Sequence, residues 1–119
     1  MVLIGSIYAN SINHATSFND AIKIAKKEDK QVMLFVYSTY CPWCKKMENE
    51  TLNDREVINH INDRFVFIAL NKDKEYIPQD FRPYGVPTTY VIDPQNVEKR
   101  YTMKGFKQKS SFLNRIDRD

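Results

Sequence analysis

Two cysteines, Cys41 and Cys44, are separated by Pro42 and Trp43, and the chain has no others. Two thiols at this spacing can close into a disulfide and reopen by thiol–disulfide exchange through a mixed-disulfide intermediate. The pair lies where an apolar run gives way to a stretch of helix formers. A thiol at a helix N-terminus is favoured as the nucleophilic thiolate, whereas a thiol one turn later is more buried. We therefore expect Cys41 to attack a disulfide and Cys44 to resolve the intermediate.

Other uses of the two thiols are less well supported. A purely structural disulfide across so short a loop would constrain little of the unfolded chain. A zinc site needs four ligands, and beyond the thiols the chain offers only His14 and His60, far away in sequence. We expect both histidines to have solvated or capping roles. The sequence thus predicts no bound metal and no cofactor besides the Cys41–Cys44 pair.

Hydrophobic patterning predicts alternating helices and strands around the cysteines. Ser17 and Asp20 form a capping box at the start of the first helix. We expect helices over 18–28 and 45–50, from about 53–54 onward and around 112–116; strands over 32–37, 65–70, 88–92 and 97–103; and a candidate edge strand at 12–16. The alternation implies parallel strands joined by right-handed crossovers, and a turn at 93–96 adds an antiparallel hairpin. The expected fold is α/β, a central mixed sheet with helices on both faces.

Composition predicts one compact domain. The chain has 119 residues, is 42% hydrophobic and carries a formal net charge of +3, with the charges scattered along it. Such a charge distribution argues against nucleic-acid binding. No apolar run approaches the roughly 20 residues that cross a bilayer, so we expect no membrane insertion.

The first residues differ from the rest of the chain. Residues 2–9 are apolar and rich in small side chains, and polar Asn10 and Ser11 follow, as at the end of a secretory signal. The basic start of such a signal is missing, and a short strand or frayed tail is the alternative. We assign 1–11 to a tail or signal remnant and 12–119 to the folded domain. A signal would place the protein in the bacterial periplasm, and the cytoplasm is the alternative.

A tripeptide, Val86-Pro87-Thr88, immediately precedes the strand at 88–92. Proline cannot donate to a sheet and therefore favours a strand start. The apolar strand before Cys41, the cysteine motif, this tripeptide and Gly105 before the last helix together resemble the thioredoxin family over nearly the whole chain. Residues 37–54 and 103–106 resemble extracytoplasmic bacterial members, particularly the soluble C-terminal domain of the membrane thiol:disulfide reductase DsbD.

The resemblance implies roles for individual residues. Cys41 would be the nucleophile, Cys44 the resolving thiol and Pro87 a cis-proline beside them. The backbone of Val86 would pair with the bound substrate chain. Copper delivery by a thioredoxin-like protein typically needs a wider cysteine spacing and a nearby histidine, and neither is evident here.

Departures from the family bear on the direction of electron flow. Many thioredoxins carry a buried Asp six positions before the first cysteine, where this chain has Phe35. Glu48 aligns with an acid of the DsbD C-terminal domain and lies four residues after Cys44, so one helical turn would bring it under the sulfurs. We expect Glu48 to accept the Cys44 proton. A solvent-facing position beside Lys45 is the alternative interpretation.

Aromatic residues near the cysteines are candidates for partner binding. Trp43, with Pro42 beside it, is expected to form an exposed apolar docking patch, although partly buried packing is a close alternative. Tyr40 and Tyr84 are candidate neighbours, with support of the core as their default interpretation.

We expect a monomeric protein-disulfide reductase that acts on protein substrates and receives electrons from an upstream thiol reductase. An oxidase or isomerase on the same fold is one alternative. A non-catalytic thioredoxin-like binding or chaperone module is the other.

Overall fold

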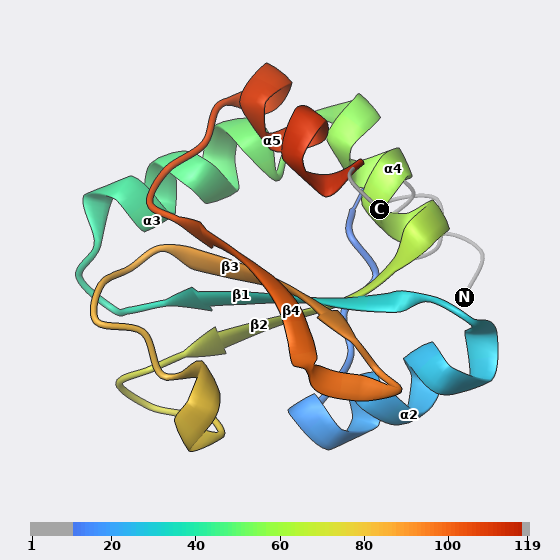
Figure 1. Cartoon of the computed structure of the whole chain (residues 1–119). Helices are drawn as coiled ribbons and strands as arrows, with labels where there is room; N and C mark the ends of the chain where they lie inside the picture. Colours follow the sequence, from blue (N-terminus) through green and yellow to red (C-terminus); the bar gives the residue numbers. More distant parts are fainter. Residues whose placement is uncertain (1–10, 118–119) are drawn as a thin grey trace, which may run out of the picture.

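A computed structural model of the chain describes residues 11–117, and the elements of this part alternate between helices and strands (Figure 1). In chain order they are α2 (Phe18–Glu28), β1 (Gln31–Tyr37), α3 (Pro42–Lys46), the π-helix η1 (Met47–Thr51), α4 (Arg55–Arg64), β2 (Phe65–Asn71), the 3₁₀ helix η2 (Gln79–Phe81), β3 (Thr88–Asp93), β4 (Asn96–Lys104) and α5 (Lys109–Ile116). The four main strands, α2, α4 and α5 match the predicted ones to within a few residues. Apart from Ser11, the tail predicted over 1–11 lies outside the described residues.

Four strands form one mixed sheet in the order β2-β1-β3-β4. Strands β1 and β2 are parallel, whereas β3 is antiparallel to both β1 and β4. The α/β class with a central mixed sheet is therefore confirmed. The edge strand expected at 12–16 is reduced to an isolated bridge between His14 and Phe67, where the Ala15 N–H donates to the Phe67 carbonyl.

Each face of the sheet has its own core because successive side chains of β1 point to opposite faces. Val32, Leu34 and Val36 pack with α2 and η2, while Met33 and Phe35 pack with η1, α4 and α5. Figure 1 shows the same division, with α3, α4 and α5 on one side of the sheet and α2 on the other. The apolar run before the cysteines is thus a strand buried on both faces, which fixes the position where Cys41 begins the next helix.

The starts of α2 and α4 are capped by side-chain oxygens. Ser17 Oγ accepts from the Asp20 N–H at the start of α2, and Asp54 Oδ2 accepts from the Val57 N–H at the start of α4. The predicted capping box is formed in one direction only. The Asp20 carboxylate accepts from the Thr16 hydroxyl at 3.0 Å, one residue before the expected partner Ser17.

The helix predicted over 45–50 is not regular. Helix α3 ends at Lys46, and the chain continues as a π-helical turn in which the Leu52 N–H donates to the Met47 carbonyl. Long-range contacts hold this turn to the loop before α5. Thr51 Oγ1 donates to the Lys107 carbonyl at 2.5 Å, and the Lys107 N–H lies 3.4 Å from Met47 Sδ. Within the described part of the chain, no helix is both long enough and apolar enough to cross a bilayer.

Candidate redox-active site

Cys41 and Cys44 form a disulfide at the start of α3. Cys41 is the N-cap residue of this helix, and its Sγ accepts a hydrogen bond from the Cys44 N–H at 3.0 Å. Pro42 occupies the first turn, where a proline costs no helical hydrogen bond. Cys41 is 8% exposed and Cys44 is 1% exposed. The residue predicted to be the nucleophile is therefore the more exposed of the two.

Pro87 lies at the same end of the sheet as the disulfide. Strand β1 runs toward Cys41, and Thr88, the first residue of β3, pairs with Val36 near the end of β1. The Val86–Pro87 peptide bond is cis. On the other side, the Gly105 N–H donates to the Pro87 carbonyl at 2.8 Å. Gly105 has φ of +82°, a conformation that favours glycine, so this residue can turn the chain beside Pro87.

A cavity of about 540 Å³ extends beneath Cys44 on the face covered by α4. Glu48 and Cys44 both line it, together with Phe35 and Tyr37. The Glu48 side chain is half-buried. The structure thus places Glu48 and Cys44 on the lining of one cavity. Phe35 is 1% exposed and fills the position where many thioredoxins carry an acid.

Tyr37 lines the same cavity as Glu48. Burial raises the pKa of Tyr37, and the carboxylates of Glu75 and Glu48 raise it further. The Tyr37 hydroxyl therefore stays protonated at neutral pH and remains a hydrogen-bond donor in the cavity.

Exposed aromatic side chains occur in the cysteine motif, next to it and in the loop before Pro87. Trp43 is 57% exposed and Tyr40 is 94% exposed, and Tyr84 is also exposed. The default interpretation of the two tyrosines as core support was therefore wrong, because both side chains lie in solvent. The Trp43 ring lies 5.7 Å from that of Phe106, centroid to centroid.

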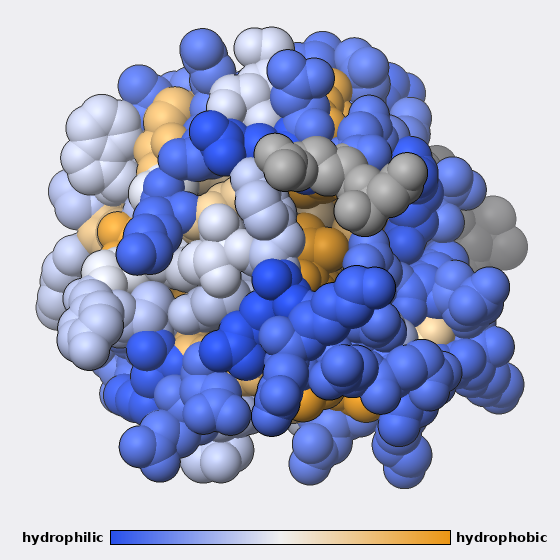
Figure 2. All heavy atoms as spheres, viewed as in Figure 1, coloured by the Kyte–Doolittle hydropathy of each residue, from blue (hydrophilic) through white to orange (hydrophobic). Residues whose placement is uncertain are grey.

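Figure 2 shows pale residues of intermediate hydropathy, with orange ones among them, at the end of the molecule where α3 lies.

Phe106 belongs to the 103–106 pattern that resembles DsbD, but the sequence did not lead us to predict it as a site residue. The sequence signal that could have identified Phe106 is its position directly after Gly105. In the structure, Gly105 is the residue that contacts Pro87.

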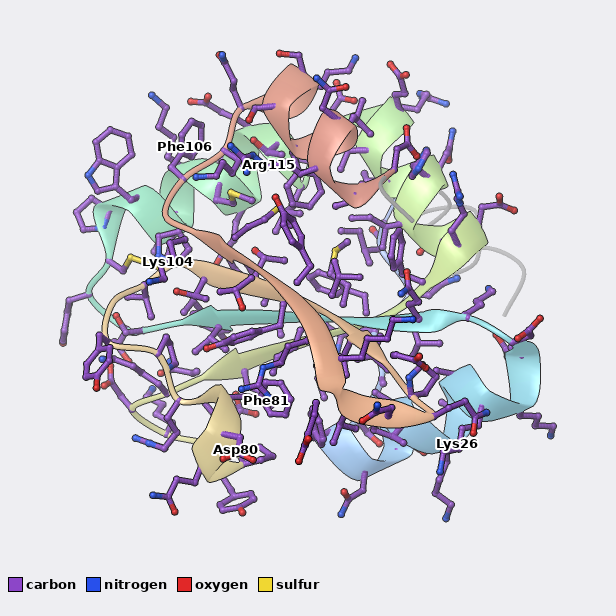
Figure 3. All side chains as sticks on the ribbon, viewed as in Figure 1. Lys26, Asp80, Phe81, Lys104, Phe106 and Arg115 are labelled. Carbon is purple, nitrogen blue, oxygen red and sulfur yellow. A yellow bond between two sulfur atoms is a disulfide. The ribbon has the colours of Figure 1, made fainter. Side chains whose placement is uncertain are left out.

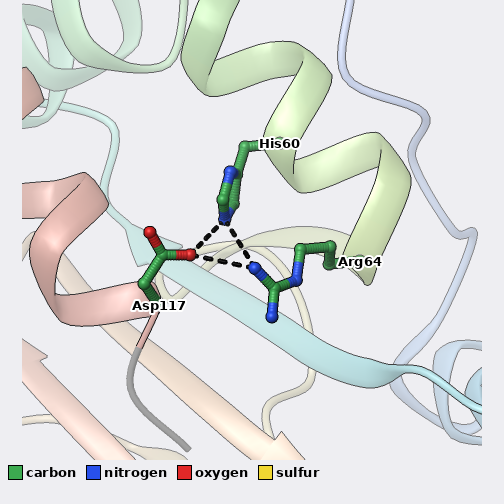
Figure 4. A network of polar contacts seen from close by, with 3 residues as sticks. All are labelled: His60, Arg64 and Asp117. Atoms are coloured by element: carbon green, nitrogen blue, oxygen red, sulfur yellow. Dashed lines mark hydrogen bonds and ion pairs between the residues drawn. The ribbon is translucent and has the colours of Figure 1, made fainter.

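The histidines lie apart from the disulfide. His60 Nε2 is 2.6 Å from Asp117 Oδ1, which also pairs with Arg64 at 3.0 Å, so this network joins α4 to the end of α5 (Figure 4). His14 Nε2 accepts from the Ala69 N–H at the edge of β2. Among residues 11–117, no group of three or more His, Cys, Asp and Glu side chains is arranged to hold a metal ion.

Residues 18–118 match the family model of the thioredoxin-like domain. The chain belongs to this thioredoxin-like family. One curated protein to which it is similar is the thiol:disulfide interchange protein DsbD of Ralstonia nicotianae. The two are 25% identical over 111 residues, and these residues cover 90% of this chain and 18% of that protein. The DsbD of Vibrio vulnificus is 29% identical over 114 residues, or 90% of this chain and 19% of that protein. The thioredoxin-like chain thus spans less than a fifth of the length of these relatives.

Solved structures give the same picture. The C-terminal domain of Neisseria meningitidis DsbD in the oxidised form is 26% identical, with a TM-score of 0.67, covering 88% of this chain and 97% of that one. A thioredoxin from Thermus thermophilus has a TM-score of 0.73 at 21% identity, covering 91% of this chain and 85% of that one, and supports the fold alone. Fold, relatives and the Cys41–Cys44 disulfide together support a thiol–disulfide oxidoreductase.

Proposed function

We propose that this thioredoxin-like protein reduces disulfides of other proteins by dithiol–disulfide exchange. The observation that carries the proposal is the Cys41–Cys44 disulfide at a strand–helix junction, in which Cys41 is the more exposed residue and its sulfur accepts a backbone N–H. Such a donor stabilises a thiolate on Cys41 once the disulfide is reduced.

The exchange proceeds in two steps. The Cys41 thiolate attacks a substrate disulfide, forms a mixed disulfide and expels one substrate thiolate. Cys44 loses its proton and attacks Cys41 Sγ, so that the second substrate thiolate leaves and the Cys41–Cys44 disulfide closes. Two electrons pass from the protein dithiol to the substrate, and an upstream dithiol reductase restores the reduced pair. Since the sulfurs carry both electrons, the proposed chemistry needs no bound cofactor or metal.

Glu48 is the proposed acceptor of the Cys44 proton. The two residues line one cavity, and Phe35 leaves no acid at the position that many thioredoxins use. The Tyr37 hydroxyl lines the same cavity and remains protonated at neutral pH. A carboxylate that takes up this proton favours attack by Cys44 and hence release of the reduced product.

Substrate chains are proposed to bind beside Pro87. Val86 is half-buried and precedes the cis-proline, which leaves its backbone as the proposed pairing partner of an extended substrate segment. Trp43, Pro42 and Tyr40 are exposed around the disulfide and would contact the rest of the partner. We further propose a monomer that acts in the bacterial periplasm, on the resemblance to extracytoplasmic members of the family. The cytoplasm is the alternative location.

A redox titration of the Cys41–Cys44 pair tests this function against its alternatives. Thioredoxin-type reductases lie near about −270 mV and strong oxidants near about −120 mV. A potential near the lower value supports the reductase, and one near the higher value supports an oxidase or isomerase. A pair that does not exchange with dithiothreitol would support a non-catalytic binding module.

Insulin reduction by the Cys41→Ser variant provides the test of catalysis. We expect its turnover to fall to the background rate of dithiothreitol alone. Undiminished turnover would overturn the proposed mechanism. A Cys44→Ser variant should instead accumulate the mixed disulfide with the substrate, because the resolving thiol is missing.

A further inference from the structure

Positive charge is concentrated around the disulfide. Three stretches border it: residues 38–48, which include α3; residues 82–88, which lead into β3; and residues 103–107, at the end of β4 and just after it. Together they contain five cationic side chains, Lys45, Lys46, Arg82, Lys104 and Lys107, and a single carboxylate, Glu48. Glu48 is half-buried and lines the cavity beneath Cys44. The surface that meets a partner is therefore far more cationic than the chain as a whole.

These cations have no acidic partner in the part of the chain that the structure describes. None of the five lies within 4.0 Å of a carboxylate oxygen of residues 11–117, whereas Lys30 pairs with Glu28 and Lys109 pairs with Asp54. The nearby loop at 71–75 also carries Asp73 and Glu75, which accept from the N–H groups of Thr39 and Asn71 and form no ion pair with any of the five cations. The charge beside the disulfide is thus left for an external anion.

Lys46 occupies a defined place within this surface. Its Nζ lies 5.3 Å from the centroid of the Trp43 ring and 5.1 Å from that of Phe106. Both distances are in the range of cation–π attraction, which neutralises no charge. The two rings therefore hold an exposed ammonium group next to the cysteine motif. Figure 3 shows Phe106 and Lys104 at the end of the molecule that carries α3, and Lys26 at the opposite end.

We propose that the protein substrates of this site carry carboxylate side chains beside their disulfide, and that Lys46 pairs with one of them. The inference rests on the proposed function and narrows its substrate class. Trp43 and Phe106 supply apolar contact for the partner, and the five unpaired cations attract its acidic flank. Complementary charge of this kind raises the rate of encounter, most strongly at low ionic strength.

The test uses three synthetic peptides that contain the same cystine-closed loop and differ only in the flanking residues, which are glutamate, glutamine or lysine. Reduction of each peptide by the full-length protein, with dithiothreitol as electron source, gives kcat/KM at low and high ionic strength. We expect the glutamate peptide to be reduced about three- to tenfold faster than the glutamine peptide at low ionic strength, and the lysine peptide to be slowest. High ionic strength should bring the three values together.

A pair of charge-reversal variants assigns the effect to this surface. Lys46→Glu should reverse the order of the glutamate and lysine peptides. Lys26→Glu changes the net charge equally, but Lys26 is an exposed residue of α2 at the far end of the molecule and should leave the order unchanged. Reduction of hydroxyethyl disulfide, a small uncharged substrate, measures the basal exchange rate of each variant, and the peptide rates of that variant are divided by it.

The outcomes separate this inference from the proposed function. If hydroxyethyl disulfide and all three peptides are reduced but the peptides show equal kcat/KM, exchange stands and the acidic-substrate inference is overturned. An equal effect of Lys46→Glu and Lys26→Glu would likewise overturn the role of this surface. If none of the substrates is reduced, both the proposed function and the inference are wrong.

Discussion

The backbone N–H of Cys44 donates a hydrogen bond to Cys41 Sγ over 3.0 Å. We expect the Cys44 N–H to donate to the Cys41 thiolate after the disulfide is reduced, because both atoms lie at the start of α3. Cys44 Sγ has no such donor among the hydrogen bonds of residues 11–117, and its residue is almost fully buried. The two chemically identical side chains are therefore made unequal by one helical turn.

Selective alkylation follows from this inequality. After reduction, iodoacetamide at neutral pH should modify Cys41 at least about tenfold faster than Cys44, since alkylation requires an accessible thiolate. Peptide mapping by mass spectrometry gives both rates in one sample. Equal rates, or faster modification of Cys44, would contradict the assignment of Cys41 as nucleophile. Denatured protein is the control and should lose the selectivity.

Replacement of Glu48 tests the proposed proton transfer. Glu48→Gln should slow the release of a preformed mixed disulfide by about tenfold or more, because general-base catalysis is typically worth at least that factor. Stopped-flow measurement of mixed-disulfide decay provides the rates.

Glu50→Gln is the matched control for Glu48→Gln. Glu50 lies on the same π-helical turn but is exposed and does not line the cavity beneath Cys44. Its replacement should leave the rate of mixed-disulfide decay unchanged. Identical behaviour of the two variants would leave Glu48 without a role in proton transfer.

The parts of the fold that could be predicted are those determined by residues close together in the sequence. The apolar run at 32–37 is too short for a helix and is buried on both faces, and β1 has this position in the structure. The π-helical turn was not predictable from the sequence. It is held by contacts such as the hydrogen bond from Thr51 to the carbonyl of Lys107, and Lys107 is remote from Thr51 in sequence.

The candidate site was likewise predictable from the sequence only in part. The cysteine motif and Pro87 were recognisable from residue type and neighbours. The exposure of Tyr40 and Tyr84 was not, since an aromatic residue in a loop has no periodicity that separates a buried side chain from an exposed one. Phe106 joins Trp43 only through the folded hairpin.

Phe35 offers a test of why this chain lacks the usual buried acid. Its ring stacks on those of Tyr37 and Phe67, with centroids at 6.0 and 6.5 Å. Phe35→Asp should lower the free energy of unfolding by about 3–5 kcal/mol, because it removes this packing and buries an unpaired carboxyl group. Urea denaturation of the oxidised protein measures the change. Phe35→Leu keeps an apolar side chain and should cost clearly less; an equal loss in both would contradict the argument.

Asp54 predicts a pH dependence of stability that is independent of the redox site. Burial raises its pKa, but the N–H of Val57 and the Lys109 ammonium outweigh this effect, and the net pKa is lowered from its ordinary value of 3.8. A carboxyl group with a lowered pKa in the folded state stabilises the protein above its unfolded pKa, and this contribution is lost as pH falls through the folded value.

Two variants separate the charge of Asp54 from its capping oxygen. At pH 7, Asp54→Ala should lower the free energy of unfolding by about 1 kcal/mol, since it removes the acceptor for the Val57 N–H. Asp54→Asn retains an acceptor and should cost less. In acid, the wild-type protein and Asp54→Asn should converge because the protonated carboxyl group has also lost its charge, while Asp54→Ala stays the least stable. Urea denaturation at a series of pH values measures all three, and a gap between wild type and Asp54→Asn that widens in acid would mean that the charge of Asp54 does not stabilise α4.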